Sequence, residues 1–327
     1  MKILIVKSSS LGDIIQCFPV VNYLHQLFPN ANIDWVVEEN FLSLVQSHPY
    51  VHRAIPKKWS EIRRERYDYL FDLQGNCKSG VIDLIAISKR KIGFANPREW
   101  PNILCTNTRF SVPKEWNIRL QYLSIVEQFF RKKIDSAQSI TLQASDFERI
   151  EPYCKKYVMV CPGSKWKNKQ LKDETLRLFL HRIFELYKMP FLFVWGSQEE
   201  KEYCEKIQTP ESVILPMRLE IPTWQHLMNA MELVIAVDSS ALHLCGTTNV
   251  PSFSVFGPTI ANVFKPIGDQ HYAYQGKCPY NRTFLKQCPI LRSCATGACI
   301  RDIATEDLLR EFSLWWTTLT QKTSKNL

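Results

Sequence analysis

The order of apolar and polar positions predicts a chain of alternating strands and helices. The β-branched run Ile3–Val6 predicts a buried strand, and apolar residues at helical spacing from Ile14 to Leu27 predict a helix. The same criteria predict further strands at 33–37 and 69–73 and helices at 41–46 and 81–88. This alternation is typical of a parallel sheet covered by helices.

A second series of strands follows a stretch, from about Asp135 to Glu151, in which strand and helix signals weaken. Its predicted strands are 157–161, 191–195, 233–237 and 252–256. The sequence therefore predicts an α/β protein with two doubly wound domains, residues 1–150 and 151–327.

The last amphipathic stretch, Thr305–Leu319, predicts a helix with Thr305 as its cap and acidic residues in its first turn. We expect this helix to pack against the body of the protein. The alternative is that Trp315 and Trp316 contact a membrane surface.

Length and composition predict a folded, cytoplasmic protein. The chain has 327 residues, 45% of them hydrophobic, and no apolar stretch approaches the roughly 18 to 20 residues that span a bilayer. We identify no signal peptide at the start of the sequence.

The formal charge of +9 is shared by both halves, and local clusters are more informative than the total. A basic segment suits phosphate or carboxylate partners, and its alternative interpretation is a solvated helix face. This segment contains Lys57, Lys58, Arg63, Arg64 and Arg66.

Eleven cysteines are present, and we expect the seven before residue 270 to be reduced core thiols. The other four are Cys278, Cys288, Cys294 and Cys299. Their spacing lacks the paired C-x-x-C pattern of zinc sites, so we expect no metal there. A non-catalytic zinc or nucleic-acid-binding module is the alternative of a different class, which predicts bound metal or strongly salt-dependent binding.

Each strand of the second series ends in a turn of small and polar residues. The four turns are Pro162–Lys165, Gly196–Glu200, Asp238–Ala241 and Gly257–Thr259. Because the ends of parallel strands share one edge, these turns predict a ligand-binding crevice. There, Ser239, Ser240 and the next helix N-terminus could hold a diphosphate, with Lys169 supplying a positive charge.

Each residue of this crevice also has a structural interpretation. Asp238 and Ser239 could simply cap a helix, Glu200 could stabilise a helix start, and His243 could be a core histidine. The P-loop and G-x-G-x-x-G motifs are absent, which disfavours kinase-like and dinucleotide redox chemistry. The Asp-x-Asp motif is absent as well, so no obvious metal-chelating pair is present.

The turn Ser8–Asp13 ends the first buried strand at a position where α/β sheets bind ligands. Asp13 is the best-placed general base in that turn, and helix capping is an equally good explanation of the same residue.

Several segments resemble the bacterial heptosyltransferases of lipopolysaccharide core assembly, glycosyltransferase family 9, and most closely the heptosyltransferase I branch. The resemblance covers nearly the whole chain. It rests on Ile5–Asp13, Asp34–Glu39, Asp72–Gly75 with Lys78-Ser79, Lys169 after Pro162–Ser164, Trp195-Gly196 with Glu200, Val237–Ser239 with His243, and Phe256–Thr259.

The resemblance implies a GT-B fold, in which two Rossmann-like domains face a central cleft. The N-terminal domain would hold the acceptor, Kdo-lipid A, and the C-terminal domain would hold ADP-heptose. Asp13 would deprotonate a hydroxyl of the first Kdo sugar, which attacks the heptose with inversion. Lys169 would stabilise the departing diphosphate, and Glu200 would hold the ribose.

Other site residues are implied in the same way. Asp238, Ser239, Ser240, Ser164 and His243 would contact the donor. Ser10 and Gly12 would contact the acceptor together with the basic segment. We expect no cofactor, no metal and no nucleic acid, a monomer, and peripheral attachment to the inner face of the inner membrane.

The sequence departs from the family pattern at three points. Asp238–His243 lacks the glycine that usually precedes the histidine, so the donor or its geometry could differ. The basic segment looks shorter than in heptosyltransferase I, and the four-cysteine stretch is similar to that of other branches, including heptosyltransferase II. The alternative function is therefore that of heptosyltransferase II or of a transferase using another nucleotide sugar.

Overall fold

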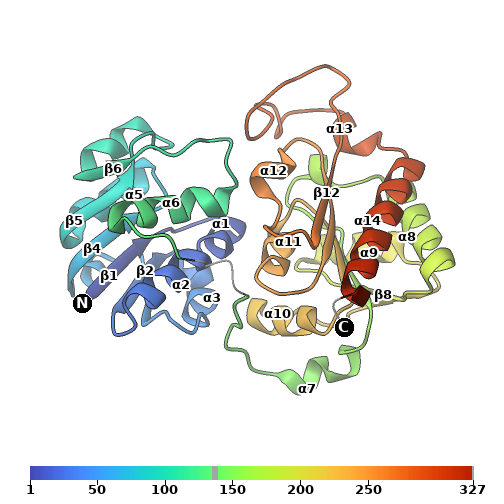
Figure 1. Cartoon of the computed structure of the whole chain (residues 1–327), viewed down its shortest axis with the longest axis horizontal. Coiled ribbons are helices and arrows are strands. Elements are labelled where there is room, and N and C mark those ends of the chain that lie inside the picture. The colour runs from blue at the N-terminus through green and yellow to red at the C-terminus, as the bar shows by residue number, and fades with distance from the viewer. Residues whose placement is uncertain (135–138, 326–327) are drawn as a thin grey trace. The chain divides into compact units, whose positions relative to one another are not determined.

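The computed structural model describes residues 1–134 and 139–325 and contains two compact units. Unit 1 is Met1–Ala144 and unit 2 is Ser145–Leu327. Each unit has one six-stranded sheet in which every pairing is parallel, and helices cover the sheets (Figure 1). The chain is therefore an α/β protein with two doubly wound sheets, as the pattern of apolar residues predicts.

The sheet of unit 1 has the strand order β3-β2-β1-β4-β5-β6. Its elements are β1 Lys2–Val6, α1 Leu11–Gln16, α2 Phe18–Leu27, β2 Asn32–Val37, η1 Glu39–Phe41, α3 Leu42–Gln46, β3 Arg53–Pro56, α4 Trp59–Ile62, β4 Arg66–Asp72, α5 Cys77–Ile85, β5 Ile87–Phe94, η2 Trp100–Cys105, β6 Thr108–Phe110 and α6 Ile118–Phe130. The order reverses between β1 and β4, so the ends of these two strands form the switch point of the sheet.

The sheet of unit 2 has the order β12-β11-β10-β7-β8-β9 and reverses between β7 and β10. Its elements are α7 Phe147–Ile150, η3 Glu151–Tyr153, β7 Val158–Cys161, η4 Lys167–Lys169, α8 Asp173–Tyr187, β8 Phe191–Phe193, α9 Gln198–Ile207, β9 Ser212–Ile214, α10 Ile221–Asn229, β10 Leu233–Val237, α11 Ser240–Cys245, β11 Ser252–Phe256, α12 Ala261–Phe264, β12 His271–Gln275, α13 Ala298–Arg301 and α14 Thr305–Lys325.

Two predicted helices differ from the observed ones. The stretch Ile14–Leu27 forms two helices, α1 and α2, which meet at Cys17 just before Pro19. Proline has no N–H and suits the first turn of a new helix, which explains the break. The helix expected at 81–88 ends at Ile85, and the following residues belong to β5.

The aromatic face of α14 is packed against unit 2. Trp316 is buried and its ring stacks on that of Phe312, and Trp315 lies 5.9 Å from the ring of Phe253. Phe312 and Phe253 belong to the core of this unit. The structure therefore favours core packing over membrane contact as the role of Trp315 and Trp316.

Candidate active site

The switch point of unit 2 brings Lys169 and Asp238 together. Asp238 follows β10, and Lys169 ends the short helix η4 in the connection after β7. The ammonium group of Lys169 donates a 2.6 Å hydrogen bond to Oδ2 of Asp238. Both side chains are largely buried. The lysine ammonium group, paired with the aspartate, therefore lies where α/β sheets bind ligands.

Asp238 organises two more side chains. Its Oδ2 accepts a 2.6 Å hydrogen bond from the hydroxyl of Thr259, and its Oδ1 lies 3.7 Å from Nε2 of His243. Burial opposes ionisation of Asp238, but attraction to Lys169 and His243 and hydrogen bonds from Lys169 and Thr259 outweigh it and lower the pKa. Asp238 is therefore a buried carboxylate that contacts three side chains, those of Lys169, Thr259 and His243.

The turn after Asp238 begins α11. Ser239 occupies the N-cap position, yet its side chain makes no capping hydrogen bond, and Ser240 is the first helical residue. Ser239 Oγ is buried and has no hydrogen-bond partner among the described residues. The Ser239 hydroxyl therefore does not cap α11. It and the N–H groups at the start of α11 can donate hydrogen bonds to a bound anion.

Glu200 lies at the start of α9, where it closes a neighbouring turn. Its Oε2 accepts a 2.7 Å hydrogen bond from the backbone N–H of Gly196. A Cβ atom on Gly163 would lie only 2.6 Å from its Oε1, so Gly163 leaves the room that the carboxylate needs. Ser164 follows directly, and its carbonyl accepts a hydrogen bond from Gln170.

Asp13 is the third residue of α1 in unit 1. Its Oδ2 accepts hydrogen bonds from the backbone N–H and hydroxyl of Ser10, at 3.2 and 2.8 Å. Its Oδ1 accepts a 3.2 Å hydrogen bond from the hydroxyl of Tyr122 and lies 3.9 Å from the ammonium group of Lys7. The two oxygens of this partly exposed carboxylate therefore have different partners, Ser10 on Oδ2 and Tyr122 with Lys7 on Oδ1.

Sequence reasoning did not assign a role to Lys7 or Tyr122. Helix α6 contacts α2 and so places Tyr122 beside the head of α1. The ammonium group of Lys7 is nearly buried and lies 5.0 Å from the centre of the Tyr122 ring. Lys7 stands in the turn that the family resemblance already included, whereas nothing in the sequence marks Tyr122, which is 109 residues from Asp13.

Asp72 occupies the other side of the unit 1 switch point, at the end of β4. Its Oδ1 accepts hydrogen bonds from the backbone of Gln74 and Gly75, and its Oδ2 accepts from Ser79 and Asn102. The Gln74 side chain in turn accepts a 3.4 Å hydrogen bond from the Ser9 backbone N–H. Asp72 therefore supports the turn that contains Asp13.

The basic segment is divided between the carboxyl-terminal and the amino-terminal ends of the strands. Lys57 follows β3 and pairs with Glu38, whose N–H donates to the Ser8 carbonyl in the Asp13 turn. Lys58 pairs with Glu39 at the same edge. Arg66 begins β4 and lies about 20 Å of strand away from Asp72.

Arg63 and Arg64 lie three and two residues before Arg66, so they also approach the amino-terminal end of β4. The structure places Lys57 and Lys58 near the Asp13 turn and does not bring these three arginines there. Lys57 and Lys58 follow the carboxyl end of β3 whereas Arg66 begins β4, so the five basic residues do not form one cluster.

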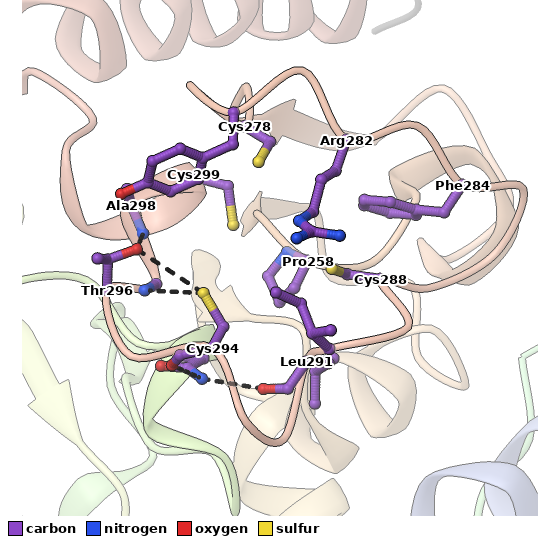
Figure 2. A pocket seen from close by; sticks show the side chains of 14 residues that line it. Pro258, Cys278, Arg282, Phe284, Cys288, Leu291, Cys294, Thr296, Ala298 and Cys299 are labelled. Atoms are coloured by element: carbon purple, nitrogen blue, oxygen red, sulfur yellow. Dashed lines mark hydrogen bonds between the residues drawn. The ribbon is translucent and has the colours of Figure 1, made fainter.

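The four late cysteines line one pocket in unit 2, and the thiols of Cys278, Cys294 and Cys299 are visible there (Figure 2). None of the four forms a disulfide. Within residues 1–134 and 139–325, no three cysteine, histidine or acidic side chains are grouped closely enough to hold a metal ion.

This cysteine segment is attached to the turns that surround Asp238. The side-chain amide of Asn168 donates to the carbonyls of Leu291 and Cys294, at 2.9 and 2.8 Å. The N–H of Cys288 donates to the carbonyl of Pro258. Since Asn168 and Pro258 are the neighbours of Lys169 and Thr259, the segment supports the residues that surround Asp238.

The fold and these sites define a two-unit α/β enzyme of the GT-B class. Residues 55–292 match the sequence profile of glycosyltransferase family 9 (heptosyltransferase), and the chain belongs to this family. It is therefore a glycosyltransferase.

Curated relatives agree with this assignment. The chain is 26% identical to lipopolysaccharide heptosyltransferase 1 of Pseudomonas aeruginosa, over 79% of each chain. It is 24% identical to lipopolysaccharide heptosyltransferase 1 of Campylobacter coli, over 81% of this chain and 87% of the relative.

Solved structures share the fold. Escherichia coli heptosyltransferase WaaC with ADP aligns with a TM-score of 0.73 and 20% identity, over 84% of this chain and 92% of that one. Escherichia coli ADP-heptose lps heptosyltransferase II aligns with a TM-score of 0.74 and 19% identity, over 98% and 100%.

Among the described residues, no helix is both long enough and apolar enough to cross a membrane.

Proposed function

We propose that this chain transfers L-glycero-D-manno-heptose from ADP-heptose to the first Kdo sugar of Kdo-lipid A, in lipopolysaccharide inner-core synthesis. Unit 1 holds the acceptor and unit 2 holds the donor. The observation that carries the proposal is the Lys169–Asp238 pair at the head of α11, a site suited to a diphosphate. Relatives named lipopolysaccharide heptosyltransferase 1 support the choice of sugar and acceptor, and so does a WaaC structure with ADP-2-deoxy-2-fluoro heptose.

The reaction begins at Asp13. Its carboxylate removes the proton from the acceptor hydroxyl, and the resulting oxygen attacks the anomeric carbon of heptose on the face opposite ADP. One C–O bond forms as the C–O bond to the diphosphate breaks, so the configuration inverts. The ammonium group of Lys7 lies 3.9 Å from Oδ1 of this carboxylate.

The leaving group is stabilised in unit 2. Negative charge grows on the diphosphate as the bond breaks, and Lys169 with the N–H groups that begin α11 is positioned before the reaction starts. Asp238, with Thr259 and His243, holds Lys169 and this turn in place. Glu200 binds the ribose hydroxyls, and Ser164 lines the same site.

The acceptor explains the expected location. Kdo-lipid A is anchored in the inner membrane, so the enzyme acts as a peripheral protein on the cytoplasmic face of that membrane.

The acceptor is bound beside the Asp13 turn. Lys57 and Lys58 contact its acidic groups, and Ser10 and Gly12 allow the acceptor to approach the backbone closely.

A second candidate is the heptosyltransferase II reaction, in which the acceptor already carries one heptose. Its support is the four-cysteine segment and a 21% identical relative, lipopolysaccharide heptosyltransferase 2 of Escherichia coli, which matches over 82% of this chain.

Mass spectrometry of the products separates the two candidates. Purified enzyme is given ADP-heptose with Kdo-lipid A or with its heptosylated form, and the gain of one heptose is measured on each. We expect the gain on Kdo-lipid A alone. A gain only on the heptosylated acceptor supports the second candidate, and inactivity on both acceptors contradicts both.

A further inference from the structure

Helix α5 of unit 1 exposes two apolar residues, while its inner face buries two polar residues beside the core residue Ile82. Val81 and Leu84 are 49% and 66% exposed, whereas Ser79 and Asp83 on the inner face are buried. An amphipathic helix that packs on a sheet normally shows the reverse arrangement. The outward side of α5 is therefore an apolar surface that faces solvent.

The adjacent helix η2 carries two further exposed apolar residues. Its residues Trp100 and Leu104 are each 73% exposed. The two helices lie side by side, because the side chain of Asn102 donates hydrogen bonds to the Ser79 hydroxyl and the Asn76 carbonyl. A Cβ atom on Gly80 would come within 2.9 Å of the Cys105 sulfur, so the contact is tight. We call Val81, Leu84, Trp100 and Leu104 the apolar face.

Two exposed cations lie at the junction of α5 and η2. Lys78 and Arg98 are the sequence neighbours of Cys77 and Glu99, and a hydrogen bond joins those two residues. Glu99 accepts a 2.8 Å hydrogen bond from the N–H of Cys77, so it also satisfies the start of α5. The apolar face is therefore accompanied by more positive than negative charge.

We propose that the apolar face, together with Lys78 and Arg98, docks unit 1 on a bilayer surface that contains anionic lipid. Tryptophan and leucine enter the head-group region and the cations meet the phosphates, as in interfacial helices. A second copy of the chain fits less well, because a two-fold contact would bring Lys78 and Arg98 against themselves. The inference rests on the proposed function, in which the acceptor is a membrane lipid.

Vesicle flotation with the full-length chain tests this surface. The vesicles contain phosphatidylcholine, alone or with one quarter phosphatidylglycerol, and no acceptor. We expect the wild type to float with the anionic vesicles, less so in high salt. The double variant Trp100→Ser/Leu104→Ser should bind about tenfold more weakly. Leu186 and Leu314 in unit 2 are similarly exposed, and Leu186→Ser/Leu314→Ser is the matched control that should bind like the wild type.

Three outcomes overturn the proposal. They are no flotation of the wild type with anionic vesicles, equal flotation of wild type and the Trp100/Leu104 variant, and a dimer in sedimentation velocity that this variant dissociates. Circular dichroism confirms that the variant is folded. Heptosyl transfer is measured separately on detergent-dispersed acceptor, so the failure of docking and the failure of the proposed reaction give different results.

Discussion

The ammonium group of Lys169 donates a 2.6 Å hydrogen bond to the carboxylate of Asp238 across the switch point of unit 2. The two residues are 69 positions apart in the sequence, and neither is fixed by local structure alone. A donor diphosphate at this point meets a lysine that is already oriented. Such orientation before the reaction is the usual source of electrostatic catalysis.

Replacing Lys169 by methionine tests its part in the reaction. We expect kcat to fall by roughly 10²-fold and the KM for ADP-heptose to rise, because charge on the diphosphate grows toward the transition state. Steady-state kinetics measures both, and Lys167→Met is the control for a neighbouring exposed lysine. A change in KM alone contradicts a role in the transition state.

Two substitutions separate the roles of Asp13. Asp13→Asn keeps an oxygen that can accept the Ser10 hydrogen bonds but loses the basic carboxylate, so we expect turnover to fall by about 10²-fold or more with donor binding unchanged. Ser10→Ala weakens the start of α1, at a cost of about 1 kcal/mol in stability, and keeps most of the turnover. Calorimetry measures the binding of ADP-heptose to each variant, and product assays measure its turnover. Near-normal turnover of Asp13→Asn would reduce Asp13 to a capping residue.

The division of the basic segment predicts unequal effects on the acceptor. Lys57→Ala should raise the acceptor KM by roughly tenfold, the usual scale for a charge-assisted hydrogen bond. Arg66→Ala, at the amino-terminal end of the strands, should change the acceptor KM by less than about twofold. Kinetics with Kdo-lipid A as the varied substrate provides the measurement. Equal effects of the two variants would contradict the assignment of Lys57 to the acceptor site.

Asp83 makes stability depend on pH. Burial, and next the charge of Asp72, raise the pKa of Asp83 to about 11. The folded state thus keeps a proton that the unfolded chain releases above about pH 4, so this contribution to stability is lost as pH rises toward 11. We expect the Tm to fall between pH 6 and pH 9, and Asp83→Asn to flatten this slope. Exposed Glu115→Gln should keep the wild-type slope.

Cys294 and Cys299 should differ in reactivity, although both line the same pocket. Hydrogen bonds from the Gly297 N–H and the Thr296 hydroxyl lower the pKa of Cys294, whereas burial raises the pKa of Cys299 to about 11. Because the thiolate is the reactive form, iodoacetamide at pH 7.5 should label Cys294 first. Peptide mass spectrometry over time measures the order. Faster labelling of Cys299 would contradict the geometry of the Gly297 turn.

Local pattern was sufficient for most of the inner strands. The runs that form β1, β7 and β10 are almost entirely apolar, and those of β2 and β11 are mostly so, because these strands are buried on both faces. The sequence predicts all five within a residue or so. Five strands toward the edges, β3, β5, β6, β9 and β12, were missed. They are short or partly exposed, so polar residues interrupt their pattern.

The candidate site was predictable only where a residue stands at the end of such a strand. Asp238 directly follows the apolar run of β10, and Asp13 ends the turn that follows β1, so each lies at the carboxyl end of a strand in its own parallel sheet. Tyr122 was not predictable in this way, because it reaches Asp13 from a helix more than a hundred residues away. The division of the basic segment was not predictable for a related reason, since closeness in sequence did not reveal that Lys57 follows β3 whereas Arg66 begins β4.

By itself, therefore, the sequence determined the α/β class, the strand ends that carry polar turns, and the family resemblance. Short-range periodicity and turn chemistry encode those features. Only the tertiary structure decided that Lys169 meets Asp238, that Asp13 is shared between Ser10 and Tyr122, and that α5 presents an apolar face to solvent. The order of strands in each sheet fixes these relationships, and that order depends on contacts between distant parts of the chain.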